Sequence, residues 1–403
     1  MQIKNFKKEE NSELSRVAAS VIWEDNNQPN RDIYFETTNK FKNDLSANPN
    51  AFLTGCILPA MYLKEKRIKI EGAISQALYN GLLRNMQLLR RWYGWKYKPV
   101  KIEARIAKND NSKTKQNKKV GLFFSGGIDS LFSLRSNRLN FALNHPYSIS
   151  DCLIIYGFDI FHDPSAENKT HVFERAVKNA SDIANDACIN LIPIATNIRH
   201  LYSYTKFWTK WFHGAALSSV AHCFSSRIGI MNIASTDSIM NLQPWGSHPR
   251  LDKNYSSEGL RIVHDKLASR IEKIKMLADW DIALQKLRVC TQNHDELLNC
   301  GKCIKCIKTM VMLLAIGKLR YATAFPRRNI TVEELKMAFR HQSQIDFNVN
   351  YLSLAELLEN EGQHELAMAI RKDAGFKGTL RRLDQQYLGN NLAKLYSLFL
   401  KSP

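Results

Sequence analysis

Four apolar stretches of strand length divide the middle of the chain, and segments with helical spacing separate them. The stretches are Val120–Phe124, Cys152–Asp159, Asn190–Asn197 and Ile228–Ala234. Helical spacing follows the first stretch to about residue 140 and returns over residues 168–187 and 213–226. Strands that are apolar throughout and alternate with helices indicate a parallel sheet covered on both faces. We therefore predict an α/β core over residues 120–288, with ligands at the carboxyl ends of its strands.

The segment before this core has a different pattern. Residues 1–108 predict a small α+β domain, in which Arg16–Trp23 and Asp32–Thr38 form a β-hairpin across a polar turn. Residues 109–119 contain four lysines and no apolar residue, which predicts a basic linker.

The end of the chain predicts a helical tail over residues 326–403. Thr331 and Ser353 are each followed three residues later by glutamate, which is the pattern of a capping box. Glu356–Lys372 and Leu380–Leu400 have the periodicity of amphipathic helices. The tail therefore reads as a module for packing or for binding a partner, and its sequence suggests no chemistry.

Composition adds mainly a charge to this picture. The 403 residues are 44% apolar, which is ordinary for a globular protein, and their net charge is +19. Such a charge favours polyanions as partners, whether nucleotides, tRNA or an acidic protein surface. The basic residues are spread over several predicted helices, so a solvated surface explains them as well. No apolar run is long enough to span a membrane and the first residues do not resemble a signal peptide, which predicts a cytoplasmic protein with no membrane partner.

The first apolar stretch ends in Ser125–Gly127 and continues with helical spacing from Ile128. A strand that turns through two glycines into a helix leaves backbone N–H groups unpaired, and such groups bind phosphate. Ser125 and Ser130 add hydroxyl donors. Asp129 would repel phosphates unless a divalent cation lies between them, so it predicts a magnesium ion. No Gly-Lys-Ser/Thr follows the glycines, which excludes a Walker A loop, and a plain strand–turn–helix connection is the alternative.

The eight cysteines fall into two groups. Four are scattered in apolar or helical contexts, as expected of reduced core residues: Cys56, Cys152, Cys188 and Cys223. The other four are clustered, with nine, two and two residues between them: Cys290, Cys300, Cys303 and Cys306. Four thiolates suit a closed tetrahedral zinc site, and Gly301 allows the tight turn that such a site needs. An iron–sulfur cluster and thiols without metal are the alternatives.

The motif Ser125-Gly126-Gly127-Ile128-Asp129-Ser130 resembles the pyrophosphate-binding loop of the PP-loop ATP pyrophosphatases. Together with the cysteine cluster it resembles the 7-cyano-7-deazaguanine synthase family, over roughly residues 118–315. The resemblance implies a nucleotide-hydrolase-like fold that binds ATP at this loop, with residues 289–325 as a zinc-binding segment. It also places the adenine beside Tyr156, Gly157 and Phe158, although an aromatic pair that fills the core explains those side chains equally well.

The same resemblance singles out residues for the substrate. Asp237 matches an aspartate that lies beside the substrate site in the family. The chain departs from the family by having Trp245-Gly-Ser-His-Pro249, followed by Asp252, in place of a Ser-Gly-Tyr-Pro-Asp-Cys segment, and His213 in place of an arginine. We expect His213, Asp237, His248 and Asp252 to bind substrate or move protons, and Trp245 to stack on a purine-like base. Structural hydrogen bonding or packing is the alternative for each of them.

The resemblance implies an enzyme that splits ATP into AMP and pyrophosphate. A carboxylate, 7-carboxy-7-deazaguanine or a related compound, takes the adenylyl group, and an amine then displaces AMP. Some relatives occur in bacterial defence cassettes, so a protein amine is an alternative acceptor to ammonia and antiviral defence an expected role. Two other functions stay open: a tRNA-modifying PP-loop enzyme, which the charge favours, and a nucleotide-sensing scaffold without turnover.

Overall fold

The computed structural model describes residues 1–107, 118–158, 170–290, 292, 297–340, 347–348 and 351–387. By its contacts the chain divides into two compact units. Unit 1 consists of Met1–Ser125, Ser136–Ser235 and Gln243–Lys266, and unit 2 of Gly126–Arg135, Thr236–Leu242 and the residues from Leu267 onward. The chain passes from unit 1 to unit 2 within the glycine motif, between Ser125 and Gly126.

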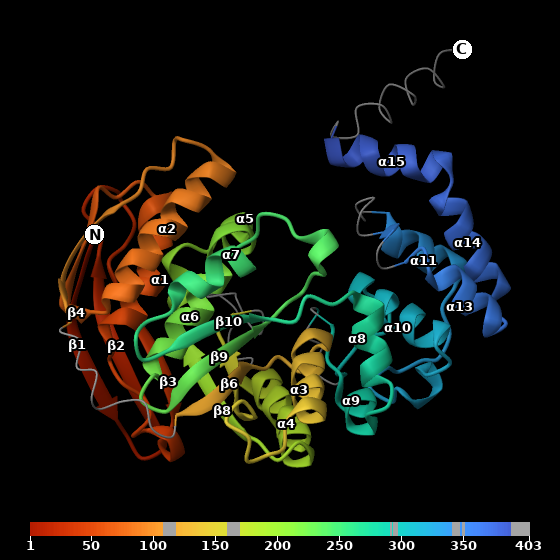
Figure 1. Cartoon of the computed structure of the whole chain (residues 1–403), viewed down its shortest axis with the longest axis horizontal. Helices are drawn as coiled ribbons and strands as arrows, with labels where there is room; N and C mark the ends of the chain where they lie inside the picture. Colours follow the sequence, from red (N-terminus) through yellow and green to blue (C-terminus); the bar gives the residue numbers. More distant parts are fainter. Residues whose placement is uncertain are drawn as a thin grey trace, which may run out of the picture. The chain divides into compact units, whose positions relative to one another are not determined.

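Unit 1 is built on one ten-stranded sheet with the order β10-β9-β6-β7-β8-β3-β2-β1-β4-β5 (Figure 1). The strands are β1 (Gln2–Glu10), β2 (Leu14–Ile22), β3 (Arg31–Thr38), β4 (Arg67–Ile74), β5 (Lys101–Ile106), β6 (Lys119–Phe123), β7 (Ile149–Tyr156), β8 (Asn190–Thr196), β9 (Ile228–Ala234) and β10 (Arg261–Asp265). The five strands from β10 to β8 are parallel, as are β1, β4 and β5, whereas β3 and β2 are antiparallel to their neighbours. The predicted α/β class with a mostly parallel sheet is therefore confirmed.

Helices cover the sheet because its central strands are apolar on both sides. The longer helices of unit 1 are α1 (Pro49–Tyr62), α2 (Gln76–Tyr93), α4 (Thr170–Asp186) and α6 (His213–Cys223). Helices α1, α2 and α6 share one apolar core with the strands, in which Phe52 of α1 meets Phe35 of β3 edge-to-face at 5.4 Å. Helix α4 packs on β7 and β8.

The first 107 residues do not carry a sheet of their own. The predicted hairpin is confirmed as β2 and β3, but β3 also pairs with β8, so that β1–β5 and β6–β10 form a single sheet. The domain boundary predicted at the 109–119 linker is therefore not a boundary in the sheet. The linker itself lies largely outside the described residues.

Unit 2 is mainly helical. Its helices are α8 (Arg270–Leu277), α9 (Asp281–Lys286), α10 (Ile304–Ala315), α11 (Val332–Phe339), α13 (Leu354–Asn360), α14 (His364–Ala374) and α15 (Phe376–Tyr387), and α3 (Ile128–Asn140) begins in it. Helix α10 packs against α8, α11 and α13. Shorter helical segments of the chain are η1 (Asn39–Phe41), η2 (Ile198–Leu201), α5 (Thr205–Phe207), η3 (Trp208–Phe212), η4 (Ile239–Asn241), α7 (Pro249–Asp252), η5 (Lys253–Tyr255) and η6 (Leu319–Tyr321).

The predicted tail is helical, with two differences in detail. The single helix predicted over Glu356–Lys372 is wrong, because the chain turns at Gly362, with φ of 71°, between α13 and α14. The capping box at Thr331 is confirmed, whereas Ser353 makes no side-chain cap. The helix predicted over Leu380–Leu400 corresponds in part to α15, and its later residues lie outside the described ones.

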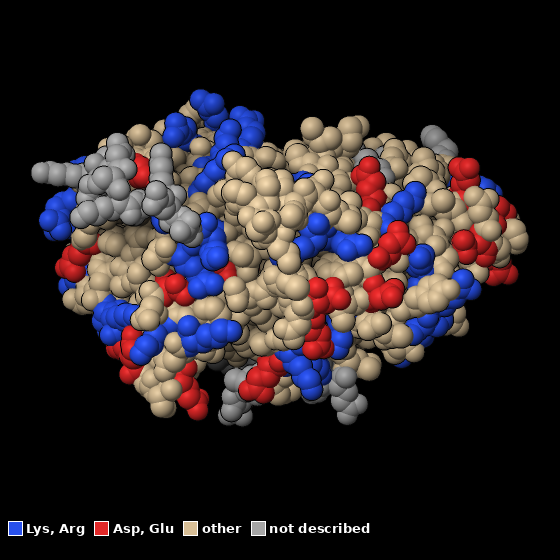
Figure 2. Space-filling view, turned by 60° about the horizontal axis from the view of Figure 1, so that its bottom comes forward, with Lys and Arg blue, Asp and Glu red and all other residues tan. Residues whose placement is uncertain are grey.

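Two findings bear on the predicted surroundings of the protein. Within the described ranges, none of the helices has the length and apolar character needed to cross a membrane. On the face drawn in Figure 2, lysine and arginine side chains lie in several separate groups with acidic side chains among them. The charge is therefore distributed on that face, as the alternative of a solvated surface implies.

Candidate functional site

The glycine motif has the predicted strand–turn–helix form, since β6 ends at Phe123 and α3 begins at Ile128. Gly126 has φ of 71°, which side chains other than glycine rarely adopt. A Cβ there would meet nothing closer than the Cβ of Arg288 at 3.9 Å, so conformation rather than crowding requires the glycine. The backbone N–H of Arg288 donates to the Gly126 carbonyl at 2.9 Å and holds the turn. Ser130 Oγ donates to the Gly127 carbonyl at 3.1 Å, inside the first turn of α3.

Asp129 is paired with two cations from α8. Its Oδ1 accepts from Arg270 Nη1 at 2.9 Å and from Lys273 Nζ at 2.7 Å. The Lys273 side chain is fully buried, and burial lowers its pKa while the carboxylate of Asp129 raises it again. The sequence predicted that a magnesium ion would balance Asp129. In the structure two protein cations, Arg270 and Lys273, contact this carboxylate.

The start of α8 is fixed locally, which places both cations. Ser269 caps the helix by accepting from the Glu272 N–H, and the Glu272 carboxylate accepts from the Ser269 N–H at 2.7 Å. This reciprocal capping box fixes the first turn of the helix. Arg270 and Lys273 are three residues apart and therefore lie on the same face of α8.

Asp237 belongs to unit 2 with the glycine turn, whereas the other predicted substrate residues belong to unit 1. Its negative charge contributes to raising the pKa of Lys273, and Lys273 also donates to the Thr236 carbonyl at 3.3 Å. Asp237 is thus part of the charged group around Lys273.

The residues predicted to lie beside the adenine have packing roles. A Cβ on Gly157 would lie 2.0 Å from the Thr196 carbonyl oxygen, so the close approach of β8 requires glycine there. Phe158 is buried, with its ring edge-to-face against Trp208 at 4.9 Å. Tyr156 is half-buried and lies 5.1 Å from the Phe173 ring. Burial against Trp208 agrees with the core-packing alternative for Phe158, and contact of Tyr156, Gly157 and Phe158 with the adenine stays a prediction.

The loop that carries Trp245 and His248 lies against the start of α6. The N–H of Gly214 donates to the Gly246 carbonyl at 3.0 Å, and a Cβ on Gly214 would lie 2.4 Å from that oxygen. His213, the first residue of α6, has its ring 6.4 Å from that of Trp245. Lys210 Nζ lies 4.7 Å from the Trp245 ring centre, a cation–π contact. The structure thus brings together His213 and Trp245, two of the residues that the sequence predicts to bind substrate.

Asp252 is the centre of a hydrogen-bonded group in the same unit. Its carboxylate is fully buried and accepts from Ser247 Oγ at 2.6 Å and from His264 Nδ1 at 2.7 Å. The His248 N–H lies 3.3 Å from the other carboxylate oxygen, and His248 Nδ1 accepts from the Arg250 N–H at 3.0 Å. Two of the predicted residues, His248 and Asp252, are therefore in direct contact.

Sequence reasoning missed His264. The strand that carries it, β10, was not predicted, although Leu260–Val263 is apolar enough to have been a signal. Its Nε2 is buried and has no hydrogen-bond partner within the described part of the chain. A buried polar atom without a partner costs about 1–3 kcal/mol.

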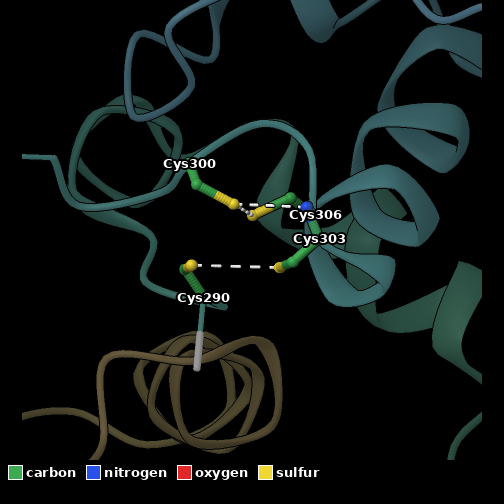
Figure 3. A group of neighbouring side chains, drawn as sticks. All are labelled: Cys290, Cys300, Cys303 and Cys306. Carbon is green, nitrogen blue, oxygen red and sulfur yellow. Dashed lines mark hydrogen bonds between the residues drawn. The ribbon is translucent and has the colours of Figure 1, made fainter. Parts of the chain in front are cut away.

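The four clustered cysteines point toward one another and come from two separate segments (Figure 3). Their Sγ atoms all lie within 4.8 Å of one another, with 3.8 Å between Cys290 and Cys303 and 3.9 Å between Cys300 and Cys306. A zinc ion with bonds of about 2.3 Å to four sulfurs has edges of about 3.8 Å in its tetrahedron. The cluster could therefore hold one metal ion such as zinc. In an iron–sulfur cluster the four cysteines would be divided among two or four irons, so at least some of their sulfurs would need to be farther apart.

Hydrogen bonds within this cluster act on the sulfurs of Cys300 and Cys303. Hydrogen bonding by Cys306 lowers the pKa of Cys303 to about 4, and the same contact raises that of Cys306. Cys300 Sγ accepts from the N–H groups of Lys302 and Cys303 at 3.4 and 3.2 Å. Gly301, with φ of 68°, makes the turn between Cys300 and these two donors. The lowered pKa of Cys303 and the N–H donors to Cys300 favour the thiolate form that binds metals, whereas burial raises the pKa of Cys290.

Asn299 holds the two segments together, and sequence reasoning missed it. The buried side chain accepts from the N–H groups of Val289 and Cys290 at 2.8 and 3.1 Å. Its Nδ2 donates to the carbonyls of Leu287 and Ala324 at 2.7 and 2.9 Å. All of its hydrogen-bonding capacity is used, so Cys290 is placed near the other three cysteines by protein contacts alone.

Comparison with known proteins adds no relative, since no family model, curated protein or solved structure matches this chain.

Proposed function

We propose that this protein is an ATP-dependent C–N ligase of the PP-loop type, which splits ATP into AMP and pyrophosphate and adenylates a carboxylate. The observation that carries the proposal is the Ser125–Ser130 motif, in which a glycine of positive φ leads into α3 while Arg270 and Lys273 lie beside it. Backbone N–H groups at a helix start, together with fixed cations, stabilise the charge that develops on a departing pyrophosphate.

The residues of the loop divide this work. The N–H groups of Gly126, Gly127 and Ile128 and the hydroxyls of Ser125 and Ser130 are our candidates for binding the phosphates. Asp129 orients Arg270 and Lys273. Magnesium bound with the nucleotide would supply further positive charge at the pyrophosphate.

The substrate that we propose is 7-carboxy-7-deazaguanine or a related carboxylate, as the resemblance to the deazaguanine synthases implies. The cluster of His213, Trp245, His248 and Asp252 in unit 1 supports a substrate site, because it combines an aromatic ring with imidazoles beside the buried carboxylate of Asp252. Asp237 is a further candidate. The acceptor is ammonia or an amine of a partner protein.

We assign a zinc ion to the cysteine cluster in a structural role. Four thiolates would fill the tetrahedral coordination of zinc and leave no open position for a substrate.

The decisive test is the fate of ATP. Incubation with 7-carboxy-7-deazaguanine and ammonium should release pyrophosphate and AMP in equal amounts, in dependence on the carboxylate. ADP as the only product would refute the ligase, and nucleotide binding without turnover would favour the sensing scaffold.

A second function, tRNA modification, is favoured by one surface of unit 1. Between Glu71 and Glu103 the chain has six basic residues and no acidic one. Trp95, in the middle of this run, is 69% exposed, and Arg90 lies 4.4 Å from its ring. Exposed cations with an aromatic ring are typical of surfaces that bind single-stranded nucleic acid. A gel shift with bulk tRNA that survives physiological salt would support this function.

A further inference from the structure

Asp252 and His264 form a buried pair whose geometry the ATP chemistry alone does not explain. The side chains are 0% and 7% exposed, and 2.7 Å separates Oδ2 of Asp252 from Nδ1 of His264. A carboxylate can only accept, so Nδ1 carries a proton, and in the neutral form of the ring Nε2 is the acceptor. Ser247 binds the same carboxylate oxygen at 2.6 Å and limits its rotation.

The acceptor nitrogen, Nε2 of His264, is buried and has no hydrogen-bond donor among the described residues. The neighbouring His248 has the opposite arrangement, because its Nδ1 accepts from the Arg250 N–H and its Nε2 therefore carries the proton. Of the two imidazoles beside Asp252, only that of His264 offers a free lone pair.

The position of His264 in the sheet fits a role at a ligand. It is the second-last residue of β10, which pairs in parallel with β9, and ligands of such sheets bind at the carboxyl ends of the strands. An imidazole whose Nδ1 donates to a buried carboxylate and whose Nε2 is bare is the arrangement of a general base.

We propose that Nε2 of His264 accepts the proton of the amine that attacks the activated carboxylate, with Asp252 as a positioning residue. This assignment rests on the proposed ligase function. The amine nitrogen forms a bond to the acyl carbon, and the bond from that carbon to the phosphate oxygen of the adenylate breaks. AMP leaves with the electron pair, the amine proton moves to Nε2, and Asp252 stabilises the resulting imidazolium.

The test separates adenylation from amide formation. His264→Asn removes the base but keeps a short side chain with an N–H, and Arg261→Gln, an exposed residue of the same strand, is the matched control. Carboxylate-dependent exchange of labelled pyrophosphate into ATP reports adenylation, and single-turnover assays with ammonium report amide formation. We expect His264→Asn to slow amide formation by about 10²–10⁴-fold and to leave exchange within a few-fold of the unmodified protein.

Asp252→Asn should also slow amide formation, because the His264 ring would lose the hydrogen bond that orients it. The pH dependence of the amide-forming rate distinguishes a general base from a structural residue. An inflection that is present in the unmodified protein should be absent from His264→Asn. Amide formation at the rate of the unmodified protein, or parallel loss of both half-reactions, would overturn the assignment.

A failure of the ligase function itself would have a different signature, since the unmodified protein would then show no exchange at all. In that case nitrogen NMR of protein labelled in its histidine rings still tests the basis of the assignment, with His264→Asn identifying the resonance. We expect Nδ1 to be protonated and Nε2 bare at pH 7.5. The opposite tautomer would overturn the proposal whatever the reaction.

Discussion

At the scale of single residues, the buried ammonium of Lys273 depends on the carboxylate of Asp129. Asp129→Asn should lower the free energy of unfolding by about 2 kcal/mol, because the buried ammonium of Lys273 loses one of its neighbouring carboxylates and the charge-assisted hydrogen bond to it. The double variant Asp129→Asn/Lys273→Met should recover most of this loss, since the charge is then absent. Urea unfolding of the single and double variants measures both effects, and additive losses would contradict the pairing.

His222 makes a second prediction at this scale. Burial lowers its pKa from 6.5 to about 4, while a hydrogen bond to the Tyr255 carbonyl at 2.8 Å raises it only in part. The unfolded chain therefore binds a proton that the folded chain excludes, and stability falls as the pH drops below 6.5 toward 4. Between pH 7 and pH 5 this residue should reduce the free energy of unfolding by about 2 kcal/mol.

Urea titrations at the two pH values, on the unmodified protein and on His222→Gln, isolate that contribution. The variant should have a smaller difference in stability between pH 7 and pH 5, even where it is less stable at both. An equal difference in the two proteins would show that His222 is not the residue that titrates.

At the scale of elements, the two sequence patterns of a capping box in the tail differ in the structure. Thr331 accepts from the Glu334 N–H and begins α11, whereas Ser353 makes no such bond at α13. Thr331→Ala should lower stability by about 1 kcal/mol, and Ser353→Ala by only a few tenths of that. Thermal or urea unfolding of the two variants compares them directly, and equal losses would contradict the assigned caps.

The sequence predicted those elements whose side chains alternate or repeat within one segment. The strands β6 to β9 and helices α3, α4 and α6 follow from apolar runs and helical periods near their observed bounds. Strand β1 was missed because five of its nine residues are lysine or glutamate. Such a composition does not predict a strand, and only pairing with β2 and β4 makes this segment one.

The limits of prediction at the candidate site have the same physical origin. The cysteine cluster could be predicted from the sequence, since three of its four members lie within seven residues. The pairing of Asp129 with Lys273 and of Asp252 with His264 joins residues that are 144 and 12 positions apart. Such contacts depend on how whole helices and strands pack against one another, and the local sequence pattern does not predict that packing.

At the scale of the whole molecule, the cysteine cluster should determine the metal content of the protein. Elemental analysis should find about one zinc per chain, and Cys303→Ser should lower this strongly because it leaves three thiol ligands. Cys188→Ser is the control, since Cys188 is exposed and outside the cluster. Iron in place of zinc would contradict the assignment.

Metal removal should also affect stability. Because Asn299 already joins the two segments that carry the cysteines, a chelator should lower the melting temperature of the protein without abolishing its helical circular dichroism. Complete loss of that signal would show that the metal, and not the protein contacts, organises the segment.

The pairing of β3 with β8 has a consequence for synthesis. Phe35 and Thr196 are partners in this ladder, so β3 leaves the ribosome some 160 residues before the strand that covers its edge. At roughly 5–20 residues per second, the hairpin of β2 and β3 waits about 10 to 30 s with one edge open. An open edge invites pairing with other chains. Nascent chains that stall before Asn190 are therefore the species of this protein most prone to aggregate, and chaperone capture during that interval would protect them.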